Sequence, residues 1–188
     1  MSRWAERLGS LGDVVRFDYP YVVAGRRSPD RLPVLVAAHA AALARARAGR
    51  AGPVVLAGKS MGGRVGCHVA LEARVDALVC LGYPLRGAGG ALRDEVLVAL
   101  RTPVLFVQGT RDRLCPLDLL EGVRRRMSAR SALHVVEGGD HSLVVAARAL
   151  REQATTQEEV DGRTLAAIAA FLADVGARAP EADAGGGR

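Results

Sequence analysis

The chain has 188 residues, of which 49% are hydrophobic and 24% are charged, and its formal net charge is +6. This apolar content excludes a chain that is mainly disordered, and three scattered cysteines (Cys67, Cys80 and Cys115) exclude a disulfide scaffold. No apolar run reaches the about 18 residues that a membrane span needs, and the charged start MSRWAERLGSLGD lacks the apolar core of a signal peptide. We therefore expect a single domain in the reducing cytoplasm.

Short apolar runs alternate with longer amphipathic segments along the chain. In chain order, the pattern predicts a helix at 3–8, a strand at 14–17, a helix within 29–49, a strand at 54–57, a helix at 61–73, a strand at 77–81, a helix at 91–100, a strand at 104–107, a helix at 116–127, a strand at 133–136 and a helix at 163–175. This alternation predicts an α/β fold, with a doubly wound, mostly parallel sheet flanked by helices. We expect this domain to cover residues 1–176, and the Gly-, Ala- and Pro-rich tail 177–188 to be disordered.

One motif carries chemistry, and it lies between a predicted strand and a predicted helix. The strand at 54–57 runs into Gly58-Lys59-Ser60-Met61-Gly62, the G-x-S-x-G pattern of a nucleophile elbow, whose sharp turn holds the serine in a strained conformation. Gly58 and Gly62 are expected to let the strand and the helix approach closely. Ser60 is the candidate nucleophile, and the Met61 N–H at the helix start is the candidate donor to an oxyanion.

The same residues also match the end of a phosphate-binding P-loop, and this alternative must be tested. That motif requires a glycine at the position of Pro53, and Gly52 is one residue out of register. The intervening VVLA favours a strand over a loop of phosphate-binding amides. The sequence therefore excludes a P-loop.

A serine nucleophile needs a general base, and the chain has four histidines. His68 follows the serine by eight helical residues, about 12 Å along the helix axis, and His134 lies at the start of a strand, far from its carboxyl end. His39 lies on the apolar face of a predicted helix, which favours a core or interface role. His141 lies in the polar loop EGGDHS after the last strand, at the edge where parallel sheets bind ligands, and is the candidate base.

The acid that orients the base should also follow a strand. Asp13 and Asp76 precede their strands, which leaves Asp18, Asp112 and Asp140 as candidates. Asp112 gives the chain order serine, acid, histidine that α/β-hydrolases use. An ion pair with a neighbouring arginine is the alternative role for this residue. Asp18 is the second candidate, and Asp140 is expected to shape the histidine loop.

Four motifs follow one another in a family-specific order: LAGKSMGGR, CLGYPL, LFVQGTRD and GGDHS, with RFDYPY and GRRSPDR nearer the start. Together they resemble the dienelactone-hydrolase-like α/β-hydrolases. More narrowly, they resemble the branch that includes testis-expressed protein thirty and the third subunit of the NSL histone-acetyltransferase complex. The resemblance covers residues 1–175 and implies that Ser60, Asp112 and His141 form a catalytic triad. Bacterial members of this branch are generally called hydrolases, whereas the complex subunit is a scaffold-like relative.

The start of the chain departs from the family pattern. Family members usually begin with a strand and a His-Gly-rich loop that supplies the second oxyanion donor, but the resemblance here begins at the helix expected at 3–8. The absent strand would lie between those at 14–17 and 54–57. We expect the protein to begin about 20 to 30 residues upstream, the length of one strand, its loop and a short lead. The alternative is a shortened chain whose neighbouring strands close the gap.

The sequence favours an enzyme that acts on small substrates. The segment 85–101 is too short for a large helical lid, so we expect an open site that takes small or polar acyl groups. We predict a serine hydrolase that cleaves an ester or related acyl bond, with neither metal nor organic cofactor. The alternative function is a non-catalytic binding or scaffold protein on the same fold.

The positive net charge suggests a nucleic-acid partner, but its distribution argues against one. Lys59 is the only lysine, and the densest arginine cluster, 124–126, lies inside a predicted helix. Nucleic-acid-binding faces concentrate basic residues, and those for single strands interleave them with aromatic ones. We therefore expect neither a nucleic-acid nor a membrane partner, and the pattern gives no oligomeric state.

Overall fold

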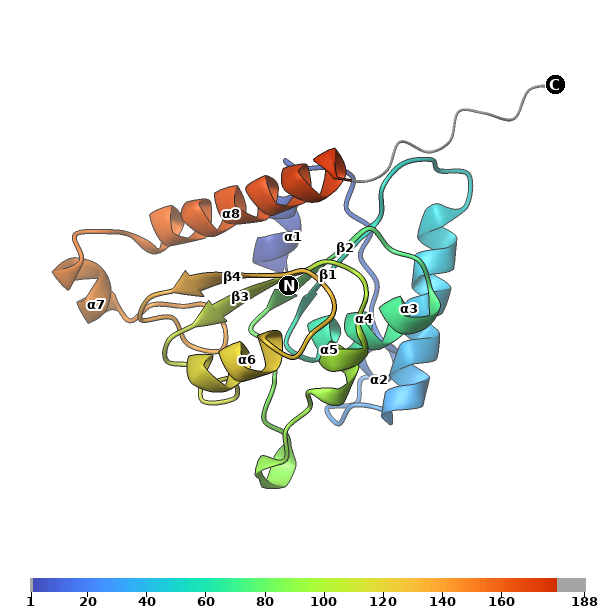
Figure 1. Ribbon diagram of the computed structural model, residues 1–188, viewed down its shortest axis with the longest axis horizontal. Helices are drawn as coiled ribbons and strands as arrows, with labels where there is room; N and C mark the ends of the chain where they lie inside the picture. Colours follow the sequence, from blue (N-terminus) through green and yellow to red (C-terminus); the bar gives the residue numbers. More distant parts are fainter. Residues whose placement is uncertain (1, 179–188) are drawn as a thin grey trace.

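A four-stranded parallel sheet forms the centre of the molecule (Figure 1). The computed structural model describes residues 2–178. The strands follow one another across the sheet in chain order: β1 (Val55–Lys59), β2 (Ala77–Leu81), β3 (Val104–Gly109) and β4 (Ser131–Val136). Every residue of β2 and β3 is buried, as central parallel strands with both faces covered require. The predicted α/β class with a parallel sheet is confirmed.

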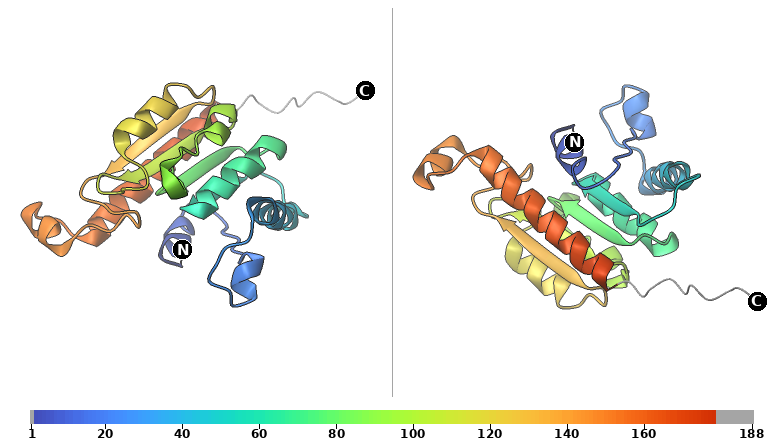
Figure 2. Two further views of the ribbon diagram at one scale, coloured as in Figure 1. Left: turned by 90° about the horizontal axis from the view of Figure 1, so that it is seen from below. Right: turned by 90° about the horizontal axis from the view of Figure 1, so that it is seen from above.

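Helices cover both faces of the sheet, as the views from below and above show (Figure 2). On one face lie α4 (Met61–Glu72), α5 (Glu95–Ala99) and α6 (Leu117–Arg124), with α3 (Leu32–Arg47) packed against α4. On the other face lie α1 (Ser2–Leu8) and the long α8 (Gln157–Ala177). The short helices α2 (Pro20–Val23) and α7 (Ala147–Glu152) lie at the periphery. The doubly wound arrangement is thus also confirmed.

The core has two apolar layers because successive strand residues point to opposite faces. Cys80 and Phe106 pack towards the α4 side, whereas Leu105 and Val107 pack towards the α8 side. Trp4 of α1 belongs to this second layer and is buried. The N-terminal helix is therefore part of the folded core.

The strand predicted at 14–17 is wrong. These residues form no regular element, and Val14 and Val15 are 43% and 51% exposed. Among the described residues, β1 pairs with β2 alone, so this segment does not join the sheet. An apolar run indicates a strand only when a partner strand lies beside it, and among residues 2–178 no strand pairs with this run.

The helix predictions also differ from the structure at several ends. The helix expected at 91–100 is reduced to α5, because the Leu92 backbone pairs instead with Arg86 in an isolated bridge. The helix expected at 163–175 is α8, which begins earlier because Thr156 and Glu159 form a capping box. Neither α2 nor α7 was predicted. The remaining predicted elements are confirmed to within a few residues. Of the predicted tail 177–188, residue 177 ends α8, and residues 179–188 lie outside the described part of the chain.

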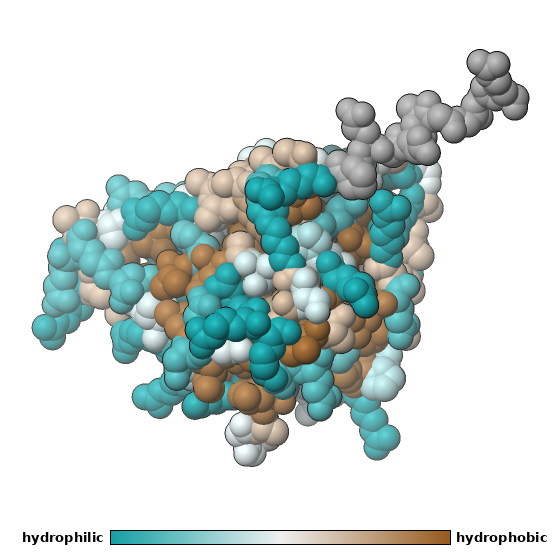
Figure 3. Space-filling view, viewed as in Figure 1, coloured by the Kyte–Doolittle hydropathy of each residue, from teal (hydrophilic) through white to brown (hydrophobic). Residues whose placement is uncertain are grey.

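The surface carries hydrophilic residues spread over the face seen in Figure 3, with apolar atoms exposed between them. In the arginine cluster 124–126, Arg124 pairs with Glu121 and Arg126 pairs with Asp94. These acidic partners neutralise part of the densest basic cluster. Among residues 2–178, no helix has both the length and the apolar character needed to cross a membrane.

His39 on α3 is a buried core histidine, as its position on an apolar helix face predicted. It is 8% exposed, and its Nδ1 lies 3.1 Å from the Tyr19 hydroxyl oxygen. The Phe17 ring lies beside it, with ring centroids 5.0 Å apart. Burial lowers the pKa of His39 to about 4, because an apolar environment disfavours the charged imidazolium.

This burial predicts a loss of stability in acid. The pKa of His39 is lower in the folded chain than its ordinary value of 6.5. Neutral His39 therefore contributes its full share to the free energy of unfolding above pH 6.5, and this share is lost as the pH falls towards 4. We expect the free energy of unfolding to fall by about 2 kcal/mol through this group between pH 7.5 and pH 5. Urea unfolding at both pH values measures this loss. His39→Gln, which cannot titrate, should lose less, and an equal loss in both proteins would contradict the assignment.

Candidate active site

Ser60 is the single residue between the end of β1 and the start of α4. Its backbone has φ 53° and ψ −119°, a combination that a non-glycine residue adopts only under strain. The Ser60 N–H donates to the Leu81 carbonyl oxygen at 2.9 Å, which ties the turn to the end of β2. The sharp turn that the motif predicts is present, and it places Ser60 at the carboxyl edge of the sheet.

The strand and the helix on either side of this turn lie unusually close together. A Cβ atom added to Gly58 would lie 2.3 Å from backbone atoms of Gly62 and Gly63, and one added to Gly63 would lie 2.8 Å from the Gly58 carbonyl oxygen. A Cβ atom added to Gly62 would meet no atom within 4 Å. The close approach predicted for Gly58 and Gly62 is thus made by Gly58 and Gly63.

His141 lies between Ser60 and Asp112 and contacts both side chains. Its Nε2 is 2.7 Å from the Ser60 Oγ, and its Nδ1 is 2.7 Å from the Asp112 Oδ2. Asp140 shapes this loop, as expected, because its Oδ1 accepts the N–H groups of Ser142 at 2.7 Å and Val144 at 3.0 Å. The structure thus brings together the three residues that the sequence selected.

The histidine loop lies directly on the carboxyl edge of the sheet. Gly82, just after β2, has φ 63°, and an added Cβ atom would lie 2.6 Å from the His141 carbonyl oxygen. At the end of β3, a Cβ atom on Gly109 would lie 2.2 Å from the Gly139 carbonyl oxygen. Only glycine fits at these two positions, so they set how closely the imidazole approaches the sheet.

Asp112 is 3% exposed and hydrogen-bonded through both carboxylate oxygens. Its Oδ1 accepts the Leu114 N–H at 2.9 Å, and its Oδ2 accepts the Gln108 amide at 2.6 Å and contacts His141. Burial alone would raise the pKa of Asp112, but the hydrogen bonds from His141, Leu114 and Gln108 outweigh it, so this pKa is lowered. Asp112 therefore stays ionised and can stabilise a protonated imidazole. Among the described residues its ion-pair partner is His141, not a neighbouring arginine.

Gln108 is a site residue that the sequence reasoning missed. It is fully buried at the end of β3, where its Oε1 accepts the Tyr83 N–H at 3.1 Å while its Nε2 donates to Asp112. A polar residue in the apolar run LFVQG was the available signal, because buried polar side chains need partners. Gln108 thus links the end of β2 to the acid.

The remaining candidates lie elsewhere. The His134 Nε2 lies 3.2 Å from the Thr164 hydroxyl on α8, and His39 contacts Tyr19. Within residues 2–178, neither His68 nor Asp18 makes a hydrogen bond to the Ser60–His141 pair. No group of three His, Cys, Asp or Glu side chains suited to a metal ion occurs in the same part of the chain.

Two cavities lie away from this site. One of about 320 Å³ is lined by residues of 15–17, α3 and the following loop, and one of about 310 Å³ is lined mainly by residues near the start of β1. Neither cavity includes Ser60, Asp112 or His141. Neither is therefore a pocket for a group attached to Ser60.

Comparisons with known proteins give one family and several similar structures. Residues 1–173 match the family described as an alpha/beta hydrolase domain. Similar solved structures include an alpha-beta serine hydrolase homologue from Coxiella burnetii (24% identity, TM-score 0.64, 75% of this chain and 67% of that chain). A putative dienelactone hydrolase from Klebsiella pneumoniae is similar at 22% identity and a TM-score of 0.58, over 84% of this chain and 68% of that chain. Est1E from Butyrivibrio proteoclasticus is similar at 17% identity and a TM-score of 0.52, over 74% of this chain and 72% of that chain. At these identities the structures support the fold alone.

The packing of the turn predicts opposite effects for two neighbouring glycines. Gly58→Ala should lower the free energy of unfolding by about 1–3 kcal/mol, because its Cβ atom has no room between β1 and α4. Gly62→Ala should leave stability unchanged or raise it by up to about 1 kcal/mol, because its Cβ atom is free in a helix. Urea unfolding of both variants measures the difference. Equal losses would show that the close contact lies elsewhere.

Proposed function

The chain belongs to the alpha/beta hydrolase domain family, and from this premise we propose that it is a serine hydrolase that cleaves an ester or related acyl bond of a small molecule. One observation carries the proposal: the continuous chain of contacts from Ser60 through His141 to Asp112, 2.7 Å on each side of the imidazole. Both distances suit the transfer of a proton from a nucleophile to an oriented base.

The mechanism follows from the contacts of the imidazole. Asp112 accepts a hydrogen bond from Nδ1–H, which leaves Nε2 of His141 unprotonated and facing the Ser60 hydroxyl. Ser60 Oγ attacks the acyl carbon while Nε2 takes its proton, and the ionised Asp112 stabilises the resulting imidazolium. The proton then passes to the leaving alcohol as the bond to it breaks. A water molecule, deprotonated by the same nitrogen, releases the acid and restores the serine.

The charge that develops on the acyl oxygen needs a hydrogen-bond donor. Met61 is the first residue of α4, and the first N–H groups of a helix have no partner within the helix. The partial positive charge at this helix end favours an oxyanion beside Ser60. One such donor is worth about 100- to 1,000-fold in rate, so we assign the Met61 N–H this role.

The surroundings of Ser60 favour small or polar acyl groups. The segment after β2 contains only a three-residue turn at Ala88–Gly90 and a short bridge before α5, instead of a helical lid. The His141 side chain is 27% exposed, so water reaches the site. A site open to water gives little apolar surface to a long acyl chain.

The sequence motifs also support a narrower relationship within the family. LAGKSMGGR and GGDHS hold Ser60 and His141, and their order matches the branch of testis-expressed protein thirty and the third NSL subunit. We infer that the chain belongs to this dienelactone-hydrolase-like branch. Since that branch includes a scaffold-like member, a binding protein on the same fold is the outcome that a test of Ser60 must distinguish.

Replacement of the nucleophile provides this test. The full chain should form a covalent adduct with a fluorophosphonate, detected by intact mass, because His141 activates Ser60. Ser60→Ala should abolish the adduct and retain the circular dichroism of the wild type. Ser142→Ala, which changes the nearby loop serine, should leave the adduct intact. A folded wild-type chain that stays unlabelled would favour the binding protein.

Replacement of the acid provides a second test. Asp112→Asn should lower the rate constant for hydrolysis of a short activated ester by about 10⁴-fold, because an amide NH₂ at this position favours the wrong imidazole tautomer. Initial rates of ester hydrolysis near pH 8 measure this rate constant. Asp18→Asn, at the second candidate acid, should retain the wild-type rate. Loss of activity in the second variant alone would reassign the acid.

A further inference from the structure

The loop that carries His141 contains a strained residue. Leu143, two positions after the histidine, has φ 62°, which is unfavourable for a residue with a branched side chain. It is also 1% exposed and packs in the core layer beneath α8. Strain of this kind persists only where the surroundings fix the backbone. Groups outside the loop must therefore hold this part of the backbone.

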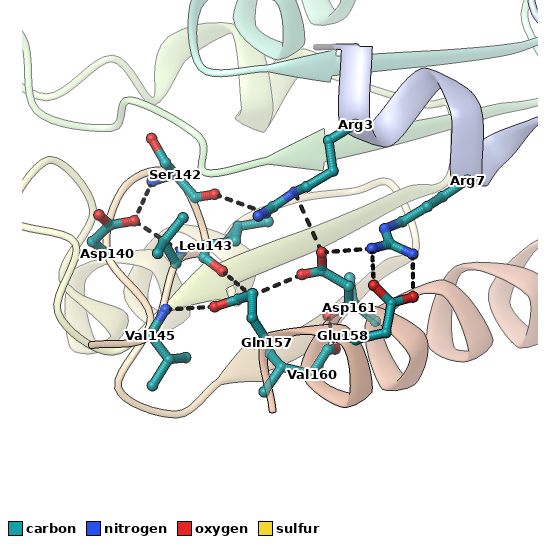
Figure 4. Close-up of polar contacts among 12 residues, drawn as sticks. Arg3, Arg7, Asp140, Ser142, Leu143, Val145, Gln157, Glu158, Val160 and Asp161 are labelled. Carbon is teal, nitrogen blue, oxygen red and sulfur yellow. Dashed lines mark hydrogen bonds and ion pairs between the residues drawn. The ribbon is translucent and has the colours of Figure 1, made fainter. Parts of the chain in front are cut away.

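Gln157, the first residue of α8, holds the loop at two points (Figure 4). Its Oε1 accepts the Val145 N–H at 2.9 Å, and its Nε2 donates to the Leu143 carbonyl oxygen at 3.1 Å. The Gln157 amide thus holds the backbone at Leu143 and two residues after it. Asp140, within the loop, accepts the N–H groups of Ser142 and Val144.

Asp161, one helical turn after Gln157, fixes which way this amide faces. It is 1% exposed, and its Oδ1 accepts the second N–H of Gln157 Nε2 at 2.8 Å. The NH₂ group therefore has two acceptors, and the carbonyl oxygen faces a donor. A reversed amide would place an oxygen against both the Asp161 carboxylate and the Leu143 carbonyl, which is unfavourable.

Two arginines of α1 contact Asp161 from the side of the N-terminal helix (Figure 4). The Arg3 Nε and the Arg7 Nη2 each lie 3.3 Å from the Asp161 Oδ2, which compensates the buried negative charge. The Arg3 Nη2 also donates to the carbonyl oxygen of Ser142, the residue next to His141, at 3.4 Å. Two helices from opposite ends of the chain thus converge on the histidine loop.

From these contacts we propose that Gln157, oriented by Asp161, is a positioning residue that holds His141 within reach of Ser60. The inference rests on the proposed function, since it concerns the base of the proposed reaction. Gln157 touches none of the reacting atoms and acts through the backbone of residues 143–145.

A purely structural role in joining α1 to α8 is the competing explanation, and the chain offers a matched control for it. Arg7 donates two hydrogen bonds, at 2.8 and 2.6 Å, to Glu158, which is the residue next to Gln157. This pair joins the same two helices without touching the loop. Glu158→Gln weakens the helix contact but keeps both arginines at Asp161 and both hydrogen bonds from Gln157 to the loop, whereas Gln157→Glu changes the loop contact with almost no change in size.

The experiment compares these two variants of the full chain by the rate of fluorophosphonate labelling at Ser60. In Gln157→Glu, an ionised carboxylate faces the Leu143 carbonyl oxygen and Asp161, so the loop should shift and the rate should fall about 10- to 100-fold near pH 8. The ratio to wild type should rise as the pH falls, because the facing Asp161 carboxylate favours the protonated form of the introduced carboxyl group, which can again donate a hydrogen bond. Glu158→Gln should stay within about twofold of wild type.

Two additions keep the test decisive. Gln157→Leu carries no charge and should show a smaller loss that does not change with pH. Proton NMR should detect the His141 Nδ1–H bonded to Asp112 in wild type and Glu158→Gln, but broadened or lost in Gln157→Glu. This signal needs no reaction, so an unlabelled wild type would refute the proposed function while the NMR comparison still decides the positioning role. Wild-type labelling rates and an unchanged Nδ1–H signal in both Gln157 variants would overturn it.

Discussion

The two contacts of the His141 imidazole are the constraint on which the site depends. They join residues that are 81 positions apart on the serine side and 29 apart on the acid side, and each contact is 2.7 Å long. No local structure can bring these residues together. The parallel sheet does so, because its strands all end at one edge and each of the three residues follows a different strand. The glycines at this edge, Gly82 and Gly109, then allow the loop to lie on the sheet.

Hydrogen bonds contribute more than the charge of His141 to keeping Asp112 ionised. Asp112 is buried, and burial alone would favour its neutral form. Its Oδ1 is satisfied by a backbone N–H, and its Oδ2 by Gln108 as well as by His141. Gln108 lies on β3 and the Leu114 N–H lies in the loop that follows it, so these two donors require little reorganisation when the imidazole gains a proton. The ionised acid is therefore a property of the fold at this edge.

The sequence predicted those features that are encoded locally. The predicted bounds of β2 agree with the structure at both ends, because a strand buried on both faces is apolar at every position. The positions of Ser60, Asp112 and His141 followed from a motif and from the order of the strands. The strand at 14–17 was wrong because apolarity says nothing about a partner. The capping box at Thr156 and Glu159 was readable, and using it would have placed the start of α8 correctly.

What the sequence could not predict is the support around the loop. Gln157 looks like an ordinary polar residue, and although Gln108 stands out in an apolar run, the partners of both arise only where distant segments meet. The loop has no regular structure, so holding it in one conformation costs backbone entropy of about 1–2 kcal/mol per residue. Asp140 and Gln157 offset this cost through four hydrogen bonds to the backbone of 142–145. Because Asp161 orients Gln157 and itself faces two arginines of α1, the folding of the N-terminal helix and the placement of His141 are physically linked.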